Sequence, residues 1–515
     1  MKNFEWGQVW PELDEFADLG RNRRVVPVVT KILVDDAAPV SLYRALADSN
    51  VGTFLLESAE ADGTWSRWSF IGVSSRAWMT SVDGTATWHG DVPEGLQREG
   101  STMDVLNSAL AELTSEPIDG LPPLTGGLVG TLGWDTLYDW WPHLRTDAPA
   151  EVPTPDASLC LADDLVAVDH RENCVWIIAN AINRNNTPDG IERAWQDAVE
   201  RVGSIRERLN RPISARASAI GDAEVPQPQW RVTKDEFEAA IQTTIDHIIA
   251  GEAGQVVVSQ RADIDSPADP LDVYRVLRSI NPSPYMLYLR LPDGTESGFT
   301  LVGSSPETLM RVSDGQVMTF PIGGTRPRPA DPLEDARVIE ELKADPKEVD
   351  EHMMLVGLST KDLEKVCEPG SVDVVDLMAI KTFSHVIHIT STVIGQLRED
   401  VTSADCLAAT FPAGTLAGDP RERAVEIISE LEPARRGIFG GVTGYFDFSG
   451  NADLAITIRT AVIKDGKASV QAGAGVVAES DPAYEYEETQ NKAGAVLKAI
   501  QIASQLAERG FPPTP

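Results

Sequence analysis

The sequence has few cysteines, few basic residues and no long apolar run. Its 515 residues include four cysteines, and none of them forms a C-x-x-C pair. Scattered cysteines of this kind are typical of reduced thiols in a cytosolic protein, and they argue against a disulfide framework or a zinc site. No apolar stretch reaches about 18 residues, so no transmembrane helix is predicted. The first ten residues lack the apolar segment of a signal peptide, so we expect a cytoplasmic location.

Positive charge is scarce as well. The chain has 44 Lys and Arg residues against 79 Asp and Glu residues, and its formal net charge at pH 7 is -35. This excess of negative charge would repel nucleic acid or an anionic membrane surface, so neither is expected as a partner. An anionic substrate would need a local cation, either a metal ion or a few converging Arg and Lys side chains.

The pattern of apolar residues predicts an α+β fold. A Thr-x-x-Glu capping box at Thr233 and Glu236 opens a helix expected to reach Ala250. Two longer helices are predicted, over residues 333–365 and 482–506. Apolar runs predict strands at 53–59, 165–170, 175–182, 255–264, 297–303, 316–320, 385–393, 444–448, 455–463 and 469–477. Because strands and helices are grouped rather than regularly alternating, largely antiparallel sheets are favoured.

One segment reads as a boundary between two parts of the chain. Residues 210–229 are rich in Pro, Ala and Ser, which is typical of a surface connection. We therefore divide the chain into an N-terminal part at 1–209, a linker at 210–229 and a second part at 230–505.

Two of the predicted helices carry paired carboxylates. Glu348 and Glu351 are three residues apart and share one helical face, and Glu485 and Glu488 repeat this spacing. Such pairs could hold Mg²⁺, which takes one or two protein carboxylates and completes its shell with water and substrate oxygens. A solvated acidic face is an open alternative. A di-iron carboxylate site is another, although it needs Glu-x-x-His pairs on two helices and the last helix has no histidine.

Other segments are suited to holding an anion. Gly324 and Thr325 follow an apolar run, where backbone N–H groups and a hydroxyl can approach a carboxylate, although a plain Gly-Gly turn is equally open. Gly473 and Gly475 in a predicted strand indicate a bulge or close backbone approach. Arg459 lies in an apolar predicted strand, on the face opposite its neighbour Ile458, and needs an ion-pair partner or a ligand there.

Three further positions could take part in acid–base chemistry or charge pairing. Glu307 follows Pro306 at a predicted strand end, where burial could raise its pKa for general-acid work; an exposed carboxylate is the alternative. His385 and His388 are three apart in a predicted strand and point to opposite faces, so at most one faces a site. Lys492 follows Glu488 by four residues, which fits an ordinary helical ion pair or a ligand contact.

In their order along the chain these segments resemble the large subunits of anthranilate synthases, within the chorismate-utilising enzymes. The matching signatures are LLES, GEAGQVVVSQR, NPSPYM, GSSPE, PIGGTRPR, EVDEHMMLV, SHVIH, FPAGT, GGVTGYFDF, IRTA, QAGAGVV and ETQNKA. They cover nearly the whole chain. The resemblance implies one α+β core, in which two large antiparallel sheets pack face to face with helices around them, so the two parts of the chain are expected to be intertwined.

The resemblance implies Mg²⁺-dependent amination of chorismate. Mg²⁺ would be held by Glu351 and Glu488, with Glu348 and Glu485 as outer carboxylates, and would bind the ring carboxylate. Glu307 would protonate the departing C4 hydroxyl while a nucleophile adds at C2. The implied substrate contacts are Gly324, Thr325, Tyr445, Arg459, Gly473, Ala474, Gly475 and Lys492.

Particular residues imply which reaction follows. Water-using relatives carry Lys where this chain has Gln255, and ammonia needs no such base, so amination is favoured. Aminodeoxychorismate synthases typically carry Lys where this chain has Gly323, so the 4-amino product is disfavoured. His388 and Thr415 are linked in the family to pyruvate elimination, the step that yields anthranilate, and both are present.

The resemblance also implies two binding partners. Ammonia would come from a separate glutamine amidotransferase subunit, because the chain has no G-x-C-x-G nucleophile motif, and an oligomeric assembly is therefore expected. The segments LLES and NPSPYM resemble the family's tryptophan feedback site, with ordinary strand and turn structure as the alternative. The candidate contacts are Glu57, Ser58, Pro284, Tyr285 and Met286.

Several positions depart from the family pattern. The usual MLVDLxRNDLGRV reads MLVGLSTKDLEKV, which changes Gly357, Thr360 and Lys361, and the usual GTLSGAPK reads GTLAGDPR, which changes Asp419 and Arg421. A paralogue that releases 2-amino-2-deoxyisochorismate is therefore an open alternative to an anthranilate synthase. Two remoter alternatives are an inactive tryptophan-binding regulatory subunit and a di-iron carboxylate oxidase.

Overall fold

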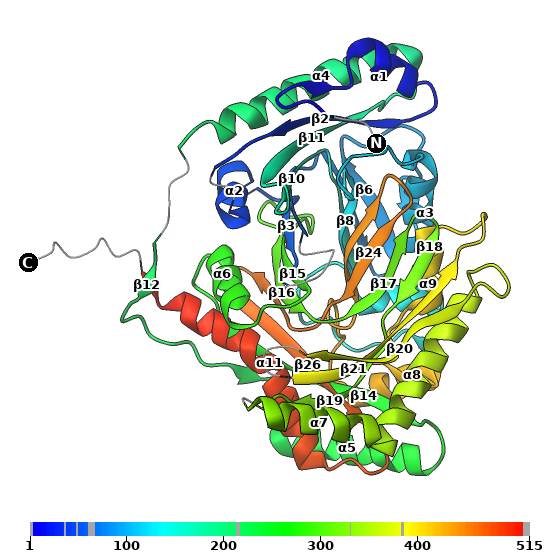
Figure 1. Ribbon diagram of the computed structural model, residues 1–515. Helices are drawn as coiled ribbons and strands as arrows, with labels where there is room; N and C mark the ends of the chain where they lie inside the picture. The colour runs from blue at the N-terminus through cyan, green and yellow to red at the C-terminus, as the bar shows by residue number, and fades with distance from the viewer. Residues whose placement is uncertain are drawn as a thin grey trace, which may run out of the picture.

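The structure, a computed structural model, consists of two large antiparallel sheets with helices around them (Figure 1). It describes residues 4–35, 38–47, 50–59, 67–212, 217–329, 331–382 and 386–507, without the side chains at positions 189, 325 and 386. The predicted α+β class is confirmed. Part of the predicted linker and His385 lie outside the described residues.

The first sheet draws on both parts of the chain. In order across the sheet, its strands are β1 (Val9–Trp10), β2 (Val25–Ile32), β11 (Cys174–Ile182), β10 (Asp164–Asp169), β4 (Trp68–Ser74), β3 (Thr53–Glu57), β15 (Tyr285–Leu291), β16 (Phe299–Ser305), β25 (Thr460–Lys464), β26 (Lys467–Val476), β14 (Gln255–Asp265) and β13 (Gln229–Trp230), with β22 (Gly418–Asp419) beside β14. Strands from before and after residues 210–229 thus meet at the pairing of β3 with β15.

The second sheet is mixed in the same way. Its order is β19 (Ile322–Pro327), β21 (Val386–Gln396), β18 (Gln316–Thr319), β17 (Thr308–Ser313), β24 (Ala452–Ile456), β23 (Val442–Asp447), β8 (Gly127–Leu132), β9 (Ala157–Leu161), β5 (Ala77–Val82), β6 (Thr85–Gly90) and β7 (Glu99–Gly100), with β20 (Asp373–Thr382) beside β21. A small separate pair joins β12 (Ala219–Ile220) to β27 (Leu506–Ala507) near the C-terminus.

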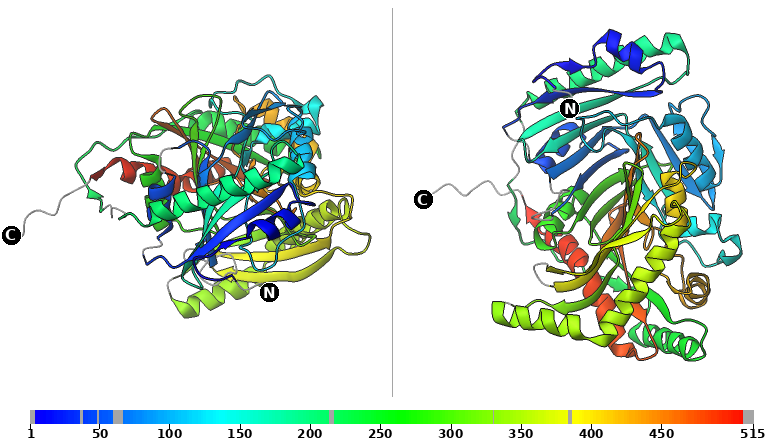
Figure 2. Two further views of the ribbon diagram at one scale, coloured as in Figure 1. Left: turned by 90° about the horizontal axis from the view of Figure 1, so that it is seen from above. Right: turned by 45° about the vertical axis from the view of Figure 1, so that its right-hand side comes forward.

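Helices cover the outer faces of the sheets (Figure 2). They are α1 (Leu13–Leu19), α2 (Pro39–Leu46), α3 (Thr102–Leu113), α4 (Pro188–Leu209), α5 (Lys234–Ile249), α6 (Pro270–Ile280), α7 (Pro332–Ala344), α8 (Pro346–Glu364), α9 (Ser403–Thr410), α10 (Arg421–Leu431) and α11 (Pro482–Ser504), with short 3₁₀ turns at η2 (Trp134–Asp139) and η3 (Pro142–Leu144). For the site, two of them matter: α8 packs on β19 and β21, and α11 packs on β26. In the described part of the chain, no helix is long and apolar enough to cross a membrane.

Side-chain alternation on the strands builds the layers. On β11, Val175 and Ile177 belong to the core cluster under the outer helices, whereas Trp176 and Ile178 belong to the cluster between the sheets. A strand buried on both faces reads as a continuous apolar run, as this segment does. The inner cluster also contains Tyr445 from β23 of the second sheet, so the two sheets face each other across it.

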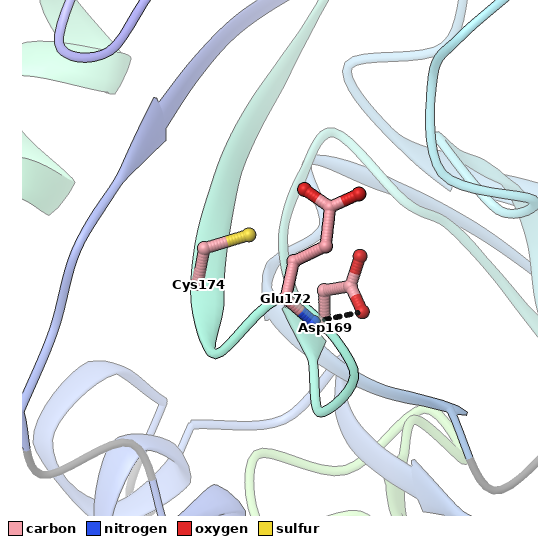
Figure 3. Close-up of side chains that lie close together, drawn as sticks. All are labelled: Asp169, Glu172 and Cys174. Carbon is pink, nitrogen blue, oxygen red and sulfur yellow. Dashed lines mark hydrogen bonds between the residues drawn. The ribbon is translucent and has the colours of Figure 1, made fainter.

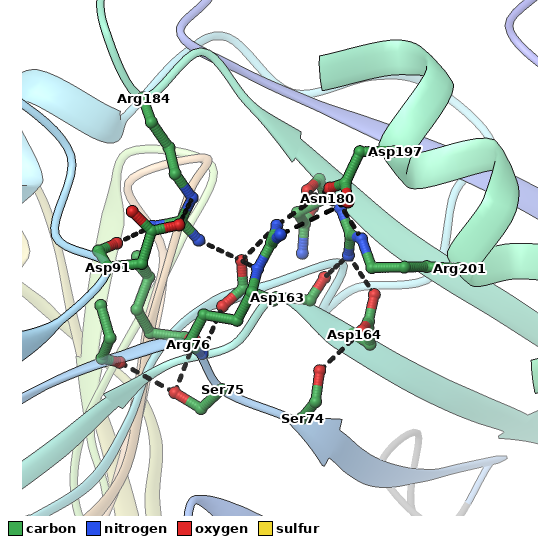
Figure 4. A network of polar contacts seen from close by, with 12 residues as sticks. Ser74, Ser75, Arg76, Asp91, Asp163, Asp164, Asn180, Arg184, Asp197 and Arg201 are labelled. Carbon is green, nitrogen blue, oxygen red and sulfur yellow. Dashed lines mark hydrogen bonds and ion pairs between the residues drawn. The ribbon is translucent and has the colours of Figure 1, made fainter. Parts of the chain in front are cut away.

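A network of ion pairs holds α4 against the first sheet (Figure 4). Arg201 on α4 pairs with Asp164 at the start of β10 and with Asp197 one turn earlier on α4, at 3.0 Å. Arg76 reaches Asp197 at 3.1 Å and Asp163 at 3.3 Å. Because Asp163 and Asp164 are buried, removing either arginine would leave a buried charge without full compensation.

Two predicted elements are each divided in the structure. The predicted helix over 333–365 is two helices, because Pro346 has no N–H to continue α7 and the Asp345 side chain accepts a hydrogen bond from Lys347 N–H (3.1 Å) to cap α8. The predicted strand over 455–463 is also wrong, since β24 ends at Ile456 in one sheet and β25 begins at Thr460 in the other. Arg459 lies in the connection, not in a strand, with a φ of 51°.

Candidate active site

Glu307 and Arg459 lie on two neighbouring crossovers between the sheets. Glu307 lies between β16 of the first sheet and β17 of the second, and Arg459 lies between β24 of the second and β25 of the first. Backbone hydrogen bonds tie the crossovers together: Ile456 N–H donates to the Glu307 carbonyl at 3.0 Å, and Ser304 N–H donates to the Arg459 carbonyl at 3.1 Å. Both sheets therefore fix the relative position of the two side chains.

The Glu307 carboxyl has the properties of a general acid. It is half-buried, and burial raises its pKa to about 7. The Thr415 hydroxyl donates a hydrogen bond to Glu307 Oε1 at 2.9 Å, and this bond opposes the rise by stabilising the ionised form. The charges of Lys492 and Arg459 act in the same direction as the hydroxyl. A carboxyl with a pKa near neutrality can both hold and release a proton at physiological pH.

Two cations converge on this acid. Burial lowers the pKa of Arg459, while the charges of Glu488 and Glu307 act to raise it. Lys492 Nζ on α11 lies 2.9 Å from the carbonyl oxygen of Gly473 and 3.2 Å from Glu488 Oε2. The left-handed backbone at Arg459 costs on the order of 1–3 kcal/mol, a kind of strain often kept at functional sites. The site thus supplies the local positive charge that an anionic ligand needs.

Carboxylates from α8 and α11 crowd together beside these cations. Burial raises the pKa of Glu351, and the neighbouring charges of Glu348 and Glu488 add to the effect. Burial likewise raises the pKa of Glu485, to which the charge of Glu488 contributes. All four carboxylates are buried or half-buried, which disfavours a solvated acidic face. A hard divalent cation prefers carboxylate oxygens and would relieve this repulsion, so the donor set fits Mg²⁺.

Glu348 has a partner of its own. Arg326 on β19 donates to Glu348 Oε1 at 2.6 Å and to Asp345 Oδ2 at 2.7 Å. Its carboxylate is therefore neutralised by an arginine, in contrast to the Glu351 carboxylate one turn further along α8. The structure places Glu348 next to the predicted metal ligands, with its charge already paired.

The glycine-rich segments take the backbone close to the site. Gly324 has a φ of 57°, and the register of β19 against β21 shifts between Gly323 and Thr325, which sets Thr325 opposite His388. Burial lowers the pKa of His388, while its hydrogen bond to the Gly324 backbone opposes this. A neutral imidazole at pH 7 can accept a proton. The Thr325 side chain is outside the described atoms.

Gln255 at the start of β14 lies over the second glycine segment on β26. A Cβ at Gly475 would stand 2.7 Å from Gln255 Nε2, so this glycine leaves the space that the amide fills. Val258 on β14 is the register partner of Ala474. Gly473, Ala474 and Gly475 are therefore brought together with Gln255 and Lys492, as the sequence predicted for a common site.

Tyr445 is placed elsewhere. It lines a cavity between the sheets together with Glu57, Ser58, Pro284 and Tyr285, the residues predicted for a tryptophan site. The sequence predicted Tyr445 as a substrate contact, whereas the structure places it beside the predicted tryptophan contacts.

Two of the predicted tryptophan contacts need comment: Glu57 is already paired within the protein, and Met286 lies in the core. The Tyr274 hydroxyl donates to Glu57 Oε2 at 2.6 Å, and Arg278 lies 3.1 Å from Glu57 Oε1. Met286 does not line the cavity, since its side chain is fully buried in the core cluster under the outer helices. A ligand in this cavity would thus meet Glu57 as an already paired carboxylate.

A second, smaller cavity of about 60 Å³ is lined by Glu307 and Thr415. It shares Thr308 and Phe320 with the first cavity, and the Tyr285 hydroxyl lies 2.8 Å from Thr308 Oγ1. Thr308, the residue that follows Glu307, therefore lines both cavities.

Two of the residues at which the chain departs from the pattern that it resembles line this second cavity or pair with Gln255. Arg421 lines it and donates two hydrogen bonds to the carboxylate of Asp362 on α8, one of them at 3.1 Å to Oδ1. Asp419 pairs in register with Gln255. Sequence reasoning did not identify the Arg421–Asp362 pair, although a new arginine and a retained aspartate in neighbouring motifs were a usable signal.

Another group of possible metal ligands lies far from the site in sequence, at the hairpin between β10 and β11 (Figure 3). Ligand atoms of Asp169, Glu172 and Cys174 lie within 4.8 Å of one another. Arg67 donates to Asp169 Oδ1 at 2.9 Å, and Lys31 pairs with Glu172 at 2.5 Å. Burial raises the pKa of the Cys174 thiol to about 11. Neutralised carboxylates and a protonated thiol indicate a structural cluster rather than a metal site.

Comparisons with known proteins agree with this geometry. A family model described as chorismate binding enzyme matches residues 55–498. Anthranilate synthase component 1 of Mycolicibacterium smegmatis is 48% identical over 500 residues, covering 96% of this chain and 94% of that protein. The same component of Arthrobacter globiformis is 45% identical over 503 residues, covering 97% and 94%. The crystal structure of anthranilate synthase component I from Streptococcus pneumoniae superposes with a TM-score of 0.73 at 30% identity, covering 85% of this chain and 94% of that one.

Proposed function

Because the chain belongs to the family of chorismate binding enzymes, we propose that it aminates chorismate at C2 in an Mg²⁺-dependent reaction with ammonia as the nucleophile. The observation that carries the proposal is the constellation around Glu307. The pKa of Glu307 is about 7, and the charges of Arg459 and Lys492 act to lower it. The charge of Glu488 in turn acts to raise the pKa of Arg459.

The predicted ligands of Mg²⁺ are Glu351 on α8 and Glu488 on α11, with Glu485 beside them and Glu348 held by Arg326. When bound, Mg²⁺ would supply a Lewis acid and a template for the ring carboxylate. The raised pKa values of Glu351 and Glu485 support this assignment, since a nearby cation would favour their ionised forms.

The first step needs a proton donor and an anion site. Glu307 would give its proton to the C4 hydroxyl, which leaves as water while ammonia adds at C2 and the ring double bonds shift. Arg459 and Lys492 would hold the negative charge of chorismate. Their burial strengthens each charge interaction relative to water, because the local dielectric is lower.

Gln255 supports ammonia rather than water as the nucleophile. Its neutral amide lies over Gly475 and cannot deprotonate water. Ammonia carries its own lone pair and needs no base. A basic side chain in place of Gln255 could deprotonate water and would favour addition of water at C2.

The second step would yield anthranilate and pyruvate. His388 is neutral near pH 7 because burial lowers its pKa, so it can accept the proton that is lost at C2, and Thr415 is in place beside Glu307. The second candidate is a synthase that stops at 2-amino-2-deoxyisochorismate. The Arg421–Asp362 pair favours it, since Arg421 departs from the family pattern and both residues line the cavity at Glu307.

We also propose a separate glutamine amidotransferase subunit as the ammonia source. Relatives named component 1 and the missing G-x-C-x-G motif support this. Tryptophan is proposed as an inhibitor that binds the cavity lined by Glu57, Ser58, Pro284 and Tyr285. The four free, buried cysteines support a reducing, cytoplasmic location.

The experiment is a pyruvate assay on the purified chain with chorismate, Mg²⁺ and ammonium, without any amidotransferase. Stoichiometric pyruvate would support the two-step synthase. Chorismate loss without pyruvate would favour the aminodeoxyisochorismate product. Unchanged chorismate would overturn the proposal.

A further inference from the structure

His352 is the residue next to Glu351 on α8, and it is fully buried. Its Nε2 atom lies 2.6 Å from Ser391 Oγ on β21, the strand that also carries His388. This contact connects a helix of the predicted metal site to a strand of the predicted elimination site. This hydrogen bond fixes the middle of α8 to the second sheet.

Ser391 is a junction of several elements. Its Oγ accepts a hydrogen bond from Met378 N–H on β20 at 3.0 Å, and its own N–H donates to the Pro321 carbonyl just before β19 at 3.0 Å. Met378 has a φ of 56°, and the register of β20 against β21 shifts between Asp376 and Ala379. The Met378 N–H is thereby turned out of the strand ladder and bonded to the Ser391 hydroxyl, so α8 and β20 meet at this hydroxyl, while the residue before β19 is bonded to the Ser391 backbone.

Two contacts bracket Glu351 along α8. Before it, Glu348 pairs with Arg326 on β19 at 2.6 Å; after it, His352 bonds to Ser391 on β21. Glu351 itself makes no such contact with the sheet in the described residues, and its carboxylate is close enough to Glu488 for that charge to raise its pKa. Its position is therefore set by its neighbours on both sides.

The residues of α8 around His352 pack closely against Gly323 of β19. A Cβ on Gly323 of β19 would stand 3.1 Å from His352 Nδ1 and 3.4 Å from Leu355 Cδ1, which is tighter than ordinary van der Waals contact. The absence of a side chain at Gly323 lets α8 approach β19 this closely. The His352 ring therefore packs directly against the backbone of β19.

We infer that His352 is a positioning residue, which acts through Ser391 to hold Glu351 at the distance from Glu488 that one divalent cation requires. This inference rests on the proposed Mg²⁺-dependent function. Removal of groups that orient metal ligands typically lowers metal affinity by about 10-fold to 100-fold. Loss of the His352–Ser391 bond is expected to raise the Mg²⁺ concentration for half-maximal effect by about 10-fold, while kcat at saturating Mg²⁺ changes little.

The test compares two amides at position 352. A glutamine places its terminal amide near the position of Nε2 and can still reach Ser391, whereas an asparagine ends near Nδ1 and cannot. His352→Gln, His352→Asn and Ser391→Ala are made in the full chain. His89→Asn is the matched control, since it breaks a comparable bond from His89 Nε2 to Thr80 Oγ1 (3.0 Å) far from the site. Two readouts are recorded against Mg²⁺ concentration: the rise in Tm, which reports binding itself, and ammonium-dependent chorismate consumption.

The expected result is a weakened Mg²⁺ response of His352→Asn and Ser391→Ala in both readouts, with His352→Gln and His89→Asn close to the parent protein. Equal behaviour of the Asn and Gln variants would overturn the inference, as would lower Tm values with an unchanged Mg²⁺ dependence. If His352→Asn fails to fold, Ser391→Ala decides in the same way. A parent protein that ignores Mg²⁺ would overturn the proposed function instead, and the positioning role with it.

Discussion

Replacement of Thr415 by valine removes one hydroxyl at nearly constant volume, and that hydroxyl donates to Glu307 Oε1 at 2.9 Å. The bond favours the ionised carboxylate, so its loss raises the pKa of Glu307 above its value of about 7. A hydrogen bond to a charged group contributes about 1.5–3 kcal/mol, and 1.36 kcal/mol corresponds to about one pKa unit. Because Glu307 is only half-buried, the lower figure applies, and we expect a rise of about one unit.

The assay is the pH profile of chorismate consumption, measured at a constant concentration of free ammonia. The parent protein loses activity as pH rises through about 7, since Glu307 must carry a proton to act as an acid. In Thr415→Val this falling limb should move up by about one pH unit, even if the maximal rate is lower. Chorismate loss is followed rather than pyruvate release, because Thr415 is also implicated in the second step. Superimposable limbs would refute the assignment of Glu307 as the acid.

Three further outcomes are expected. Glu307→Gln should lower chorismate turnover at least about 100-fold. The pKa of Glu307 is about 7 in the folded protein and 4.5 ordinarily, so its ionisation destabilises the parent protein as pH rises between these values. Thermal unfolding should therefore show Glu307→Gln to be more stable than the parent near pH 8, by at most about 3 kcal/mol, but not near pH 4. Glu351→Gln and Glu488→Gln should each abolish the rise in Tm on addition of Mg²⁺, whereas a retained rise would remove that residue from the ligand set. Asp362→Asn should destabilise the protein by about 2–3 kcal/mol in urea unfolding, because it leaves the largely buried Arg421 without its carboxylate; no change would show that the pair contributes nothing to stability.

Local chemistry made some elements predictable from the sequence. The capping box at Thr233 and Glu236 is present, and α5 follows it as expected. The Glu-x-x-Glu spacing placed each carboxylate pair on one helical face, because that depends only on helix geometry. The break between α7 and α8 was also available in principle, from Pro346 behind Asp345.

Features that depend on how distant segments meet could not be predicted in this way. Arg459 reads as part of one apolar strand, yet the chain changes sheets there, and apolar residues suit either sheet equally well. Thr415 and Glu307 are 108 residues apart, and nothing local indicates their hydrogen bond. His352 and Ser391 are 39 residues apart, and nothing local indicates their contact either. These are contacts between elements, which propensity and spacing do not encode.

The most direct test of the central claim is mass spectrometry of the products from chorismate, Mg²⁺ and ammonium carrying the heavy nitrogen isotope. The account predicts that the label appears in a single aminated product, either anthranilate with one pyruvate released per chorismate or 2-amino-2-deoxyisochorismate, and that Glu307→Gln forms it at least about 100-fold more slowly. Unlabelled isochorismate, or chorismate that remains unconsumed, would contradict amination at C2 by this site.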